Sequence, residues 1–339
     1  MKQHRFLIGT MALVLAASLV EGQGRQGGGA AQAPQINWNQ KMPWGPLEAA
    51  VRLRWQGQPL TAQKTEPFKV FDNIYYVGIQ VVGAYLITTN AGLILVDATY
   101  AETGDLVIDG IRKLGLDPAN IKYILITHQH ADHFAGAGRV LQVAKGARVG
   151  MSQADWEGVE RLQAPGQGGN QDTGITLTRD LVIKDGDVIR LGDTALNVYV
   201  TPGHTPGSLA IELQGKADKR TFRSLIPNTG INPSPDLTRP YIASMERLKQ
   251  MGPWDAVLPV HGFLAQVDLP LEPRELIFSA RQPAPRPKVA HPAALGPAKI
   301  NEYFDAMLKV AREKLATEQA RTTTSSRRPL HVDTAAVTS

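Results

Sequence analysis

The sequence predicts an α+β fold, in which helices pack on sheets built from two runs of strands. The first run occupies residues 68–97, and a tight turn at 90–92 indicates antiparallel pairing. Strand and helix then alternate through 103–151, which is the pattern of a layered α/β arrangement. A second run of strands follows from 181 to 226. Apolar residues make up 43% of the 339 residues, which is enough for a sizeable core.

Composition and periodicity indicate the individual elements. Strands are expected where β-branched and aromatic residues run together, as in 70–77 and 123–126. Helices are expected where apolar residues recur at helical spacing, as at Leu106, Ile108 and Ile111 within 103–114. The other strands are predicted at 82–89, 93–97, 148–151, 181–183, 188–191, 196–200, 209–213, 222–226 and 256–260, and the other helices at 134–145, 152–162, 241–251 and 298–314.

Both ends of the chain are expected to lie outside the folded core. Lys2 and Arg5 precede an apolar stretch over 6–20 and then small residues, which is typical of a secretory signal peptide. The stretch is short for a membrane span, so we expect no stable membrane anchor and a periplasmic or secreted protein. The predicted organisation is a signal peptide over 1–23, a flexible leader and N-terminal arm over 24–65, one folded domain over 66–315 and a disordered tail over 316–339.

The clearest chemical signal is the segment His-Gln-His-Ala-Asp-His at 128–133, directly after a predicted strand. Three of the chain's eight histidines fall within these six positions beside an aspartate, so a coincidental polar loop is a poor explanation. His128 and His130 point the same way on an extended chain, whereas Asp132 and His133 follow after the chain turns. Four donors on one tight loop cannot all bind one tetrahedral ion, so the loop predicts a site for two metal ions.

Two further histidines also follow predicted strands. His204 lies between two Pro-Gly turns within 201–208, a rigid setting that suits a metal ligand. His261 ends the apolar run over 256–260. Three separate predicted strands are each followed by a histidine, and this pattern predicts a single site at the edge of a sheet. Asp97 also ends a strand, and there we expect a structural carboxylate that accepts backbone hydrogen bonds.

Composition narrows the chemistry. The chain contains no cysteine, so the metal must be held by histidine and carboxylate, and neither a disulfide nor a thiolate nucleophile is available. The formal charge of +5 is spread along the chain without basic stripes or interleaved aromatic residues, which disfavours nucleic acid as a partner. A small-molecule substrate is expected instead, and the oligomeric state is left open.

Together, the segments 128–133 and 201–208 and the distal His261 resemble the metallo-β-lactamase superfamily over residues 66–315. The similarity is greatest to the third subclass of metallo-β-lactamases. It implies a four-layer αβ/βα sandwich and two Zn²⁺ per chain. The same resemblance implies that His128, His130 and His204 hold the first zinc ion, that Asp132, His133 and His261 hold the second, and that Asp97 is chiefly structural.

One segment departs from part of that superfamily. Its dinuclear thioesterases and lactonases carry a metal-bridging aspartate at the end of the strand that corresponds to 222–226. This chain instead reads Ser-Leu-Ile-Pro-Asn-Thr-Gly over 224–230, which favours the third lactamase subclass. Members of that subclass often bind the substrate carboxylate through serines near this point, and here Asn228 and Thr229 are the polar candidates for substrate binding. Many also carry a disulfide near the carboxyl end, which a chain without cysteine lacks.

The resemblance implies an exported di-zinc hydrolase that opens the β-lactam ring of antibiotics with a metal-bound hydroxide. Asp132 is the catalytic residue in this prediction, because it helps to orient the attacking water as well as binding metal. A related metallo-hydrolase acting on lactones, thioesters or phosphodiesters would use the same ligands and is the alternative. A non-catalytic binding module with this fold is the second alternative, and the intact set of six ligands disfavours it.

Overall fold

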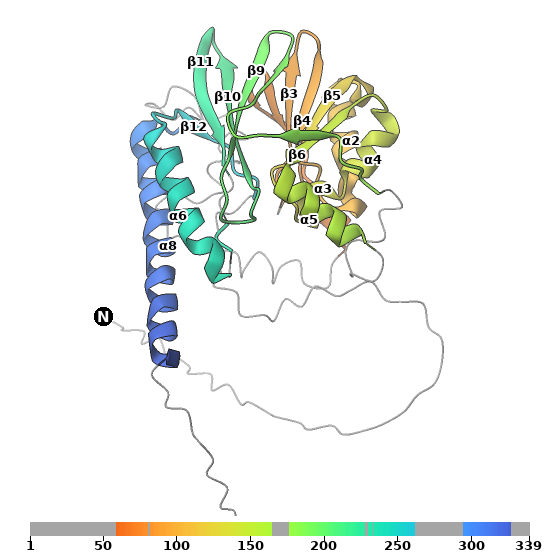
Figure 1. The fold of residues 1–339 in the computed structure, drawn as a ribbon. Helices are drawn as coiled ribbons and strands as arrows, with labels where there is room; N and C mark the ends of the chain where they lie inside the picture. Colours follow the sequence, from red (N-terminus) through yellow and green to blue (C-terminus); the bar gives the residue numbers. More distant parts are fainter. Residues whose placement is uncertain are drawn as a thin grey trace, which may run out of the picture. The chain divides into compact units, whose positions relative to one another are not determined.

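The computed structural model describes residues 59–80, 82–164, 176–227, 230–232, 234–261 and 294–326, and within them the strands form two sheets (Figure 1). The first sheet has the order β1 (Phe68–Phe71), β2 (Ile74–Tyr76), β3 (Tyr85–Thr89), β4 (Gly92–Val96), β5 (Ile121–Leu125), β6 (Arg148–Ser152) and β7 (Leu181–Ile183), antiparallel as far as β4 and parallel from β4 onward. The second has the order β12 (Ala256–Val257), β11 (Arg220–Ile226), β10 (Leu209–Ala217), β9 (Thr194–Val200) and β8 (Val188–Leu191), antiparallel except between β11 and β12.

Helices cover the outer face of each sheet. The first sheet packs against α2 (Gly104–Lys113), α3 (Ala131–Phe134), α4 (Ala137–Val143) and α5 (Gln153–Gln163), with short 3-10 helices η1 (Leu60–Gln63), η2 (Ala101–Thr103) and η3 (Pro118–Asn120) nearby in the chain. The second packs against α6 (Pro235–Gln250) and α8 (Pro297–Ser326), which lie side by side (Figure 1). This arrangement confirms the predicted α+β sandwich with αβ/βα layers. Among the described helices, none combines the length and apolarity needed to cross a membrane.

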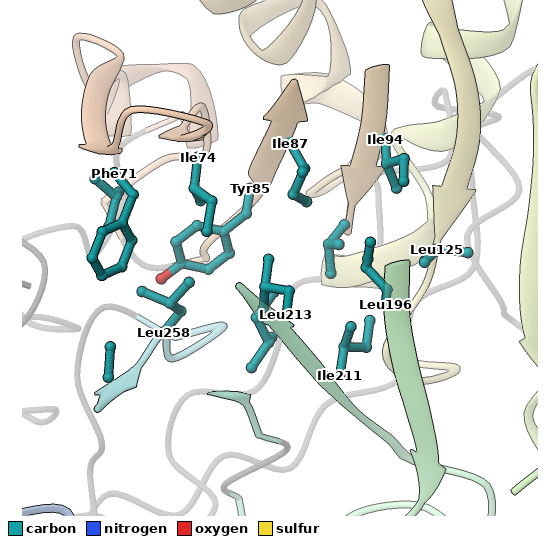
Figure 2. Close-up of a cluster of buried hydrophobic side chains, with 14 of the residues drawn as sticks. Phe71, Ile74, Tyr85, Ile87, Ile94, Leu125, Leu196, Ile211, Leu213 and Leu258 are labelled. Atoms are coloured by element: carbon teal, nitrogen blue, oxygen red, sulfur yellow. The ribbon is translucent and has the colours of Figure 1, made fainter. Parts of the chain in front are cut away.

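The main core lies between the two sheets. Figure 2 shows Ile87 and Ile94 of the first sheet facing Leu196, Ile211 and Leu213 of the second, and all five are buried. A strand that is buried on both faces needs apolar residues at consecutive positions, because successive side chains point to opposite faces. The β4 strand meets this requirement, which explains why it reads as an unbroken apolar run.

The predicted strand over 70–77 is wrong, because the structure divides it into β1 and β2 at Asp72 and Asn73. The Asn73 amide donates to the carbonyl of Gln214 at 2.9 Å, and its Oδ1 accepts from the backbone N of Lys216 at 2.8 Å. These bonds pin the turn to β10 in the second sheet. The helix predicted over 134–145 is likewise divided, into α3 and α4.

The two helices over the second sheet are longer than predicted. The α6 helix begins at Pro235 and contains Pro240, whereas the sequence pattern predicts a start only at Tyr241. The α8 helix continues to Ser326, into the tail predicted to be disordered from 316. The extension is tied to α6, because Glu318 pairs with Lys314 and accepts a hydrogen bond from the Thr238 hydroxyl at 3.1 Å.

The remaining domain boundaries stay predictions. The predicted signal peptide, the leader and most of the N-terminal arm, and the tail from 327 lie outside the described residues. Asn228 and Thr229 also lie outside them.

Candidate metal centre

The structure brings all six predicted metal ligands together. Four of them come from the segment that links β5 to α4, namely His128, His130, Asp132 and His133. The other two come from the second sheet, His204 from the connection between β9 and β10 and His261 from the chain just after β12. They form two groups, which we call the first trio (His128, His130 and His204) and the second trio (Asp132, His133 and His261).

The ring nitrogens of the first trio converge on one point. Nδ1 of His130 lies 3.1 Å from Nε2 of His128 and 2.9 Å from Nε2 of His204. The three ligand atoms all lie within 4.8 Å of one another. Tetrahedral zinc with bonds to nitrogen of about 2.0–2.1 Å holds its ligand atoms about 3.3 Å apart, so these separations suit a zinc ion.

The second trio has the same compactness. Nε2 of His133 lies 3.1 Å from Nε2 of His261 and 3.4 Å from Oδ2 of Asp132, and Oδ2 of Asp132 lies 3.7 Å from Nε2 of His261. His128 adjoins this trio, since its ligand atom lies within 4.8 Å of those of Asp132 and His133. The two trios are therefore neighbours, as a site for two ions requires.

In three of the ligand histidines, the ring nitrogen that faces away from the metal position, Nδ1, lies within hydrogen-bond distance of an oxygen atom. Nδ1 of His133 lies 2.8 Å from Oδ2 of Asp97, and Nδ1 of His204 lies 2.9 Å from the carbonyl of Gly230. The Thr127 hydroxyl donates to Asp97 at 2.8 Å and so accepts from Nδ1 of His128 at 3.1 Å. Metal-binding histidines usually donate their second N–H in this way, which fixes the ring and directs the other nitrogen at the metal.

Asp97 has the structural role that we predicted. Its Oδ1 accepts from the backbone N of Thr127 at 2.7 Å, and its side chain is fully buried. Its contacts to His133 and, through Thr127, to His128 were not evident from the sequence. One carboxylate thus orients a ligand of each trio.

Burial and neighbouring charges keep the histidine rings of the first trio neutral, which is the form that binds metal. Burial, together with the neighbouring histidines, lowers the pKa of His128 and His204 well below the usual value, so both rings are neutral at pH 7. Burial lowers the pKa of His130 as well, against an opposing effect of Asp132. Metal ligands must be deprotonated, so the first trio is prepared to bind an ion.

The second trio carries an internal ion pair instead. Burial by itself would raise the pKa of Asp132, but the charge and hydrogen bond of His133, together with His261 and His130, outweigh burial and hold the pKa below its usual value. Burial by itself would lower the pKa of His133, but Asp132 and Asp97 raise it to about 10. An ion that binds here would displace the proton of His133 and keep the carboxylate that is already charged.

Gly230 is a site residue that sequence reasoning missed. A Cβ at this position would lie 2.6 Å from Nδ1 of His204, so only glycine lets its carbonyl approach the ring this closely. The signal was available in the sequence as the glycine that directly follows the two predicted substrate contacts, Asn228 and Thr229. The ligand distances, the neutral rings of the first trio and the oxygen contacts behind the rings together fit a pair of zinc ions.

Sequence comparison gives a family match over the central part of the chain. Residues 78–216 match the model described as the metallo-beta-lactamase superfamily, a range that includes every predicted ligand except His261. Human mitochondrial persulfide dioxygenase ETHE1 is 34% identical over 103 residues, covering 30% of this chain and 32% of that protein. Hydroxyacylglutathione hydrolase of Cereibacter sphaeroides is 32% identical over 107 residues, covering 32% and 35%. The chain thus spans about a third of the length of these curated relatives.

Solved structures match over a much larger share. BJP-1, a subclass B3 metallo-beta-lactamase of Bradyrhizobium japonicum, is 27% identical with a TM-score of 0.62, covering 79% of this chain and 100% of that chain. GOB-18, a metallo-beta-lactamase from Elizabethkingia meningoseptica, shares the fold at 24% identity and a TM-score of 0.62, covering 78% and 96%. The family model across the central ligands and the match to the full length of BJP-1 show a metallo-β-lactamase superfamily domain with the metallo-β-lactamase fold in this chain.

Proposed function

We propose that this metallo-β-lactamase superfamily hydrolase is an exported di-zinc enzyme that opens the β-lactam ring of antibiotics. The observation that carries the proposal is the pair of adjoining trios, with ligand separations between 2.9 and 3.7 Å within them. In this proposal the first trio and the second trio each hold one zinc ion. Zinc bound there supplies Lewis acidity, which polarises a carbonyl and lowers the pKa of water to about 7.

Asp132 is the residue that we assign a catalytic role besides metal binding. It is the only anion among the six ligands, and His133 keeps it ionised. Its side chain is 20% exposed, and its Oδ2 lies against the ring nitrogens of His133 and His261. An ionised carboxylate accepts hydrogen bonds and can therefore orient a water molecule for attack on a carbonyl carbon.

The choice of a lactam substrate depends on the end of β11. Resemblance to the thioesterases and lactonases of the superfamily would require a bridging aspartate there, but the strand ends on Leu225 and Ile226, which are fully buried and apolar. The similarity to subclass B3 enzymes over the whole length of BJP-1 supports the same choice. Asn228 and Thr229, our proposed substrate contacts, precede Gly230, whose carbonyl reaches a ligand of the first trio.

Thioester hydrolysis is the second candidate. It is favoured by the 32% identity to hydroxyacylglutathione hydrolase, a protein of which this chain matches only about a third. The same two trios would serve such a reaction. The six ligands by themselves are also compatible with lactones and phosphodiesters, although the apolar end of β11 disfavours thioesters and lactones. The substrate must therefore be decided by assay.

The test is a panel of substrates with zinc-loaded protein. We expect turnover of a penicillin, a cephalosporin or a carbapenem, and slower or no turnover of an acyl-homoserine lactone and of a glutathione thioester. The His204→Ala protein serves as the control for contaminating activity. Brisk hydrolysis of the lactone or thioester without any lactam turnover would overturn the proposed substrate class and leave the metal site intact.

Export is tested separately by mass spectrometry of the protein from an extracytoplasmic fraction. The proposed signal peptide predicts a mature amino terminus between Gly22 and Gln35. Full-length protein that begins at Met1 and is found only in the cytosol would contradict export.

A further inference from the structure

One face of α5 lies against both of the loops that carry the first trio. Ser152, Asp155 and Gly158 follow one another at intervals of three residues, which places them on the same side of the helix. Ser152 caps the helix by accepting a hydrogen bond from the backbone N of Asp155 at 3.3 Å. The carboxylate of Asp155 and the bare backbone of Gly158 are thereby turned toward the ligand loops.

Asp155 joins these two loops directly. Its Oδ2 accepts from the backbone N of Gln129 at 3.2 Å and from the Thr205 hydroxyl at 2.7 Å, and its Oδ1 accepts from the backbone N of Gly207 at 3.1 Å. Gln129 separates His128 from His130, and Thr205 directly follows His204. Asp155 itself is only 1% exposed. A single buried carboxylate therefore connects the neighbours of all three ligands of the first trio.

Two glycines lie where these loops meet α5. A Cβ at Gly207 would lie 2.0 Å from Oγ of Ser152, so this loop can approach α5 only with glycine at that position. A Cβ at Gly158 would lie 1.2 Å from Oε1 of Gln129. That oxygen is buried and has no hydrogen-bond partner among the described residues, so packing over Gly158, rather than a polar contact of this atom, locates it.

We propose that Asp155 is a positioning residue of the first metal site, and that Gly158 completes the same support by accommodating Gln129. The first trio is drawn from two loops that belong to different sheets, so its geometry depends on a common anchor. A carboxylate can accept from three donors at once, whereas an amide at the same position would place an NH₂ group against at least one of them. The inference rests on the proposed zinc site and not on the proposed substrate.

The experiment measures zinc affinity by competition with a chromophoric chelator, using the protein without its proposed signal peptide. Two binding steps are expected, and the His204→Ala and His261→Ala proteins identify which step belongs to which trio. Asp155→Asn should weaken the first-trio step by roughly 10–100-fold, the range typical for residues that orient ligands, and leave the other step unchanged. Glu160→Gln is the matched control on the same helix, because Glu160 pairs with Arg179 at the surface. It should leave both steps unchanged.

A second set of variants decides the matter if Asp155→Asn does not fold. Gly158→Ala should weaken the first-trio step, and the double variant Gly158→Ala with Gln129→Ala should restore it, because the shorter side chain removes the clash. An unchanged first step in Asp155→Asn, equal weakening of both steps, or a Gly158→Ala defect that Gln129→Ala fails to restore would each overturn the inference. A wild-type protein that binds no zinc would instead contradict the proposed function.

Discussion

The two trios differ in how firmly the protein holds their ligands. In the first trio, the ring of His204 donates to the Gly230 carbonyl at 2.9 Å, and its own carbonyl accepts from the Asn232 amide at 2.6 Å. In the second trio, His261 follows the two-residue strand β12, forms an isolated backbone bridge with Val82 and has a side chain that is 29% exposed. His261 thus follows a much shorter strand than the seven-residue β9 that precedes His204. We therefore expect the second ion to be released first when zinc becomes scarce.

The largest expected effect comes from removing one ligand from each trio. His204→Ala should lower the zinc affinity of the first site by more than the roughly 10–100-fold expected when a ligand loses its hydrogen-bond partner. His261→Ala should lower the zinc affinity of the second site to the same extent. Elemental analysis after dialysis should then give close to one zinc ion per chain for each variant, against two for the wild type. Loss of both ions from both variants would mean that the trios bind as one coupled unit, and the comparison would fail.

Asp132→Asn comes next and concerns the second trio alone. The change keeps the volume but replaces the anionic ligand by a weaker, neutral one, so the second ion should bind less tightly while the first stays in place. Turnover should fall by roughly 10–100-fold or more, with little change in thermal unfolding in excess zinc. A variant that is fully active with two ions bound would show that Asp132 is not a ligand.

The buried charge of Asp155 predicts a pH-dependent stability. Burial raises the pKa of this carboxyl group to about 6, against the opposing hydrogen bonds of Thr205, Gly207 and Gln129 and the charge of Arg161. The folded state thus binds more protons than the unfolded state between about pH 4 and 6, so this group lowers the free energy of unfolding as pH rises through that window. The loss is on the order of 3 kcal/mol at pH 7.

Denaturant unfolding of chelator-treated wild type and Asp155→Asn across pH 4–7 measures this effect. Histidine titrations contribute to both proteins and cancel in the difference. The asparagine variant should gain stability relative to the wild type as pH rises. If the free energies of unfolding of the two proteins changed in parallel with pH, burial would not destabilise the Asp155 carboxylate. Asp155 would then position the first trio without lowering the stability of the protein.

The smallest expected effect concerns Thr127→Val, which removes the hydroxyl between Asp97 and His128 but keeps the shape. The ring of His128 loses its acceptor, while Asp97 keeps its contacts to His133 and to the backbone N of Thr127. First-trio zinc affinity should fall by about 10-fold, the lower end of the range for such partners. The same chelator competition measures it, and an equal loss in the second trio would show that Asp97 itself has moved.

Local patterns were sufficient to predict the ligands but not the residues that support them. Histidines at strand ends predict a metal site because the carboxyl ends of neighbouring strands meet at one edge. Asp155, by contrast, lies three residues after Ser152, which is the ordinary pattern of a helix N-terminus, and that pattern is satisfied by the backbone alone. Its carboxylate contacts loops that are 26 and 50 residues away in sequence, and no local periodicity reports such contacts.

The fold was predictable to a similar degree. The two runs of strands and the alternating middle section were enough for the layered α+β arrangement, because burial on one or both faces leaves a clear periodicity. The division at Asp72 and Asn73 was missed because it depends on bonds from Asn73 to β10, more than a hundred residues away. The extension of α8 was missed because a polar surface helix resembles a disordered segment in composition, and its contacts with α6 are tertiary.

The packing of the Gln129 side chain on Gly158 also couples these two positions in the evolution of the protein. With glutamine at 129 in its present conformation, a methyl group at 158 would overlap the glutamine amide, so the glutamine side chain would have to move. Relatives with a larger residue at 158 are therefore expected to have a shorter one at 129, with the two substitutions arising together or the shortening arising first. The spacer between the first two histidines, which makes no contribution to the ligand set itself, should then vary in step with the helix behind it.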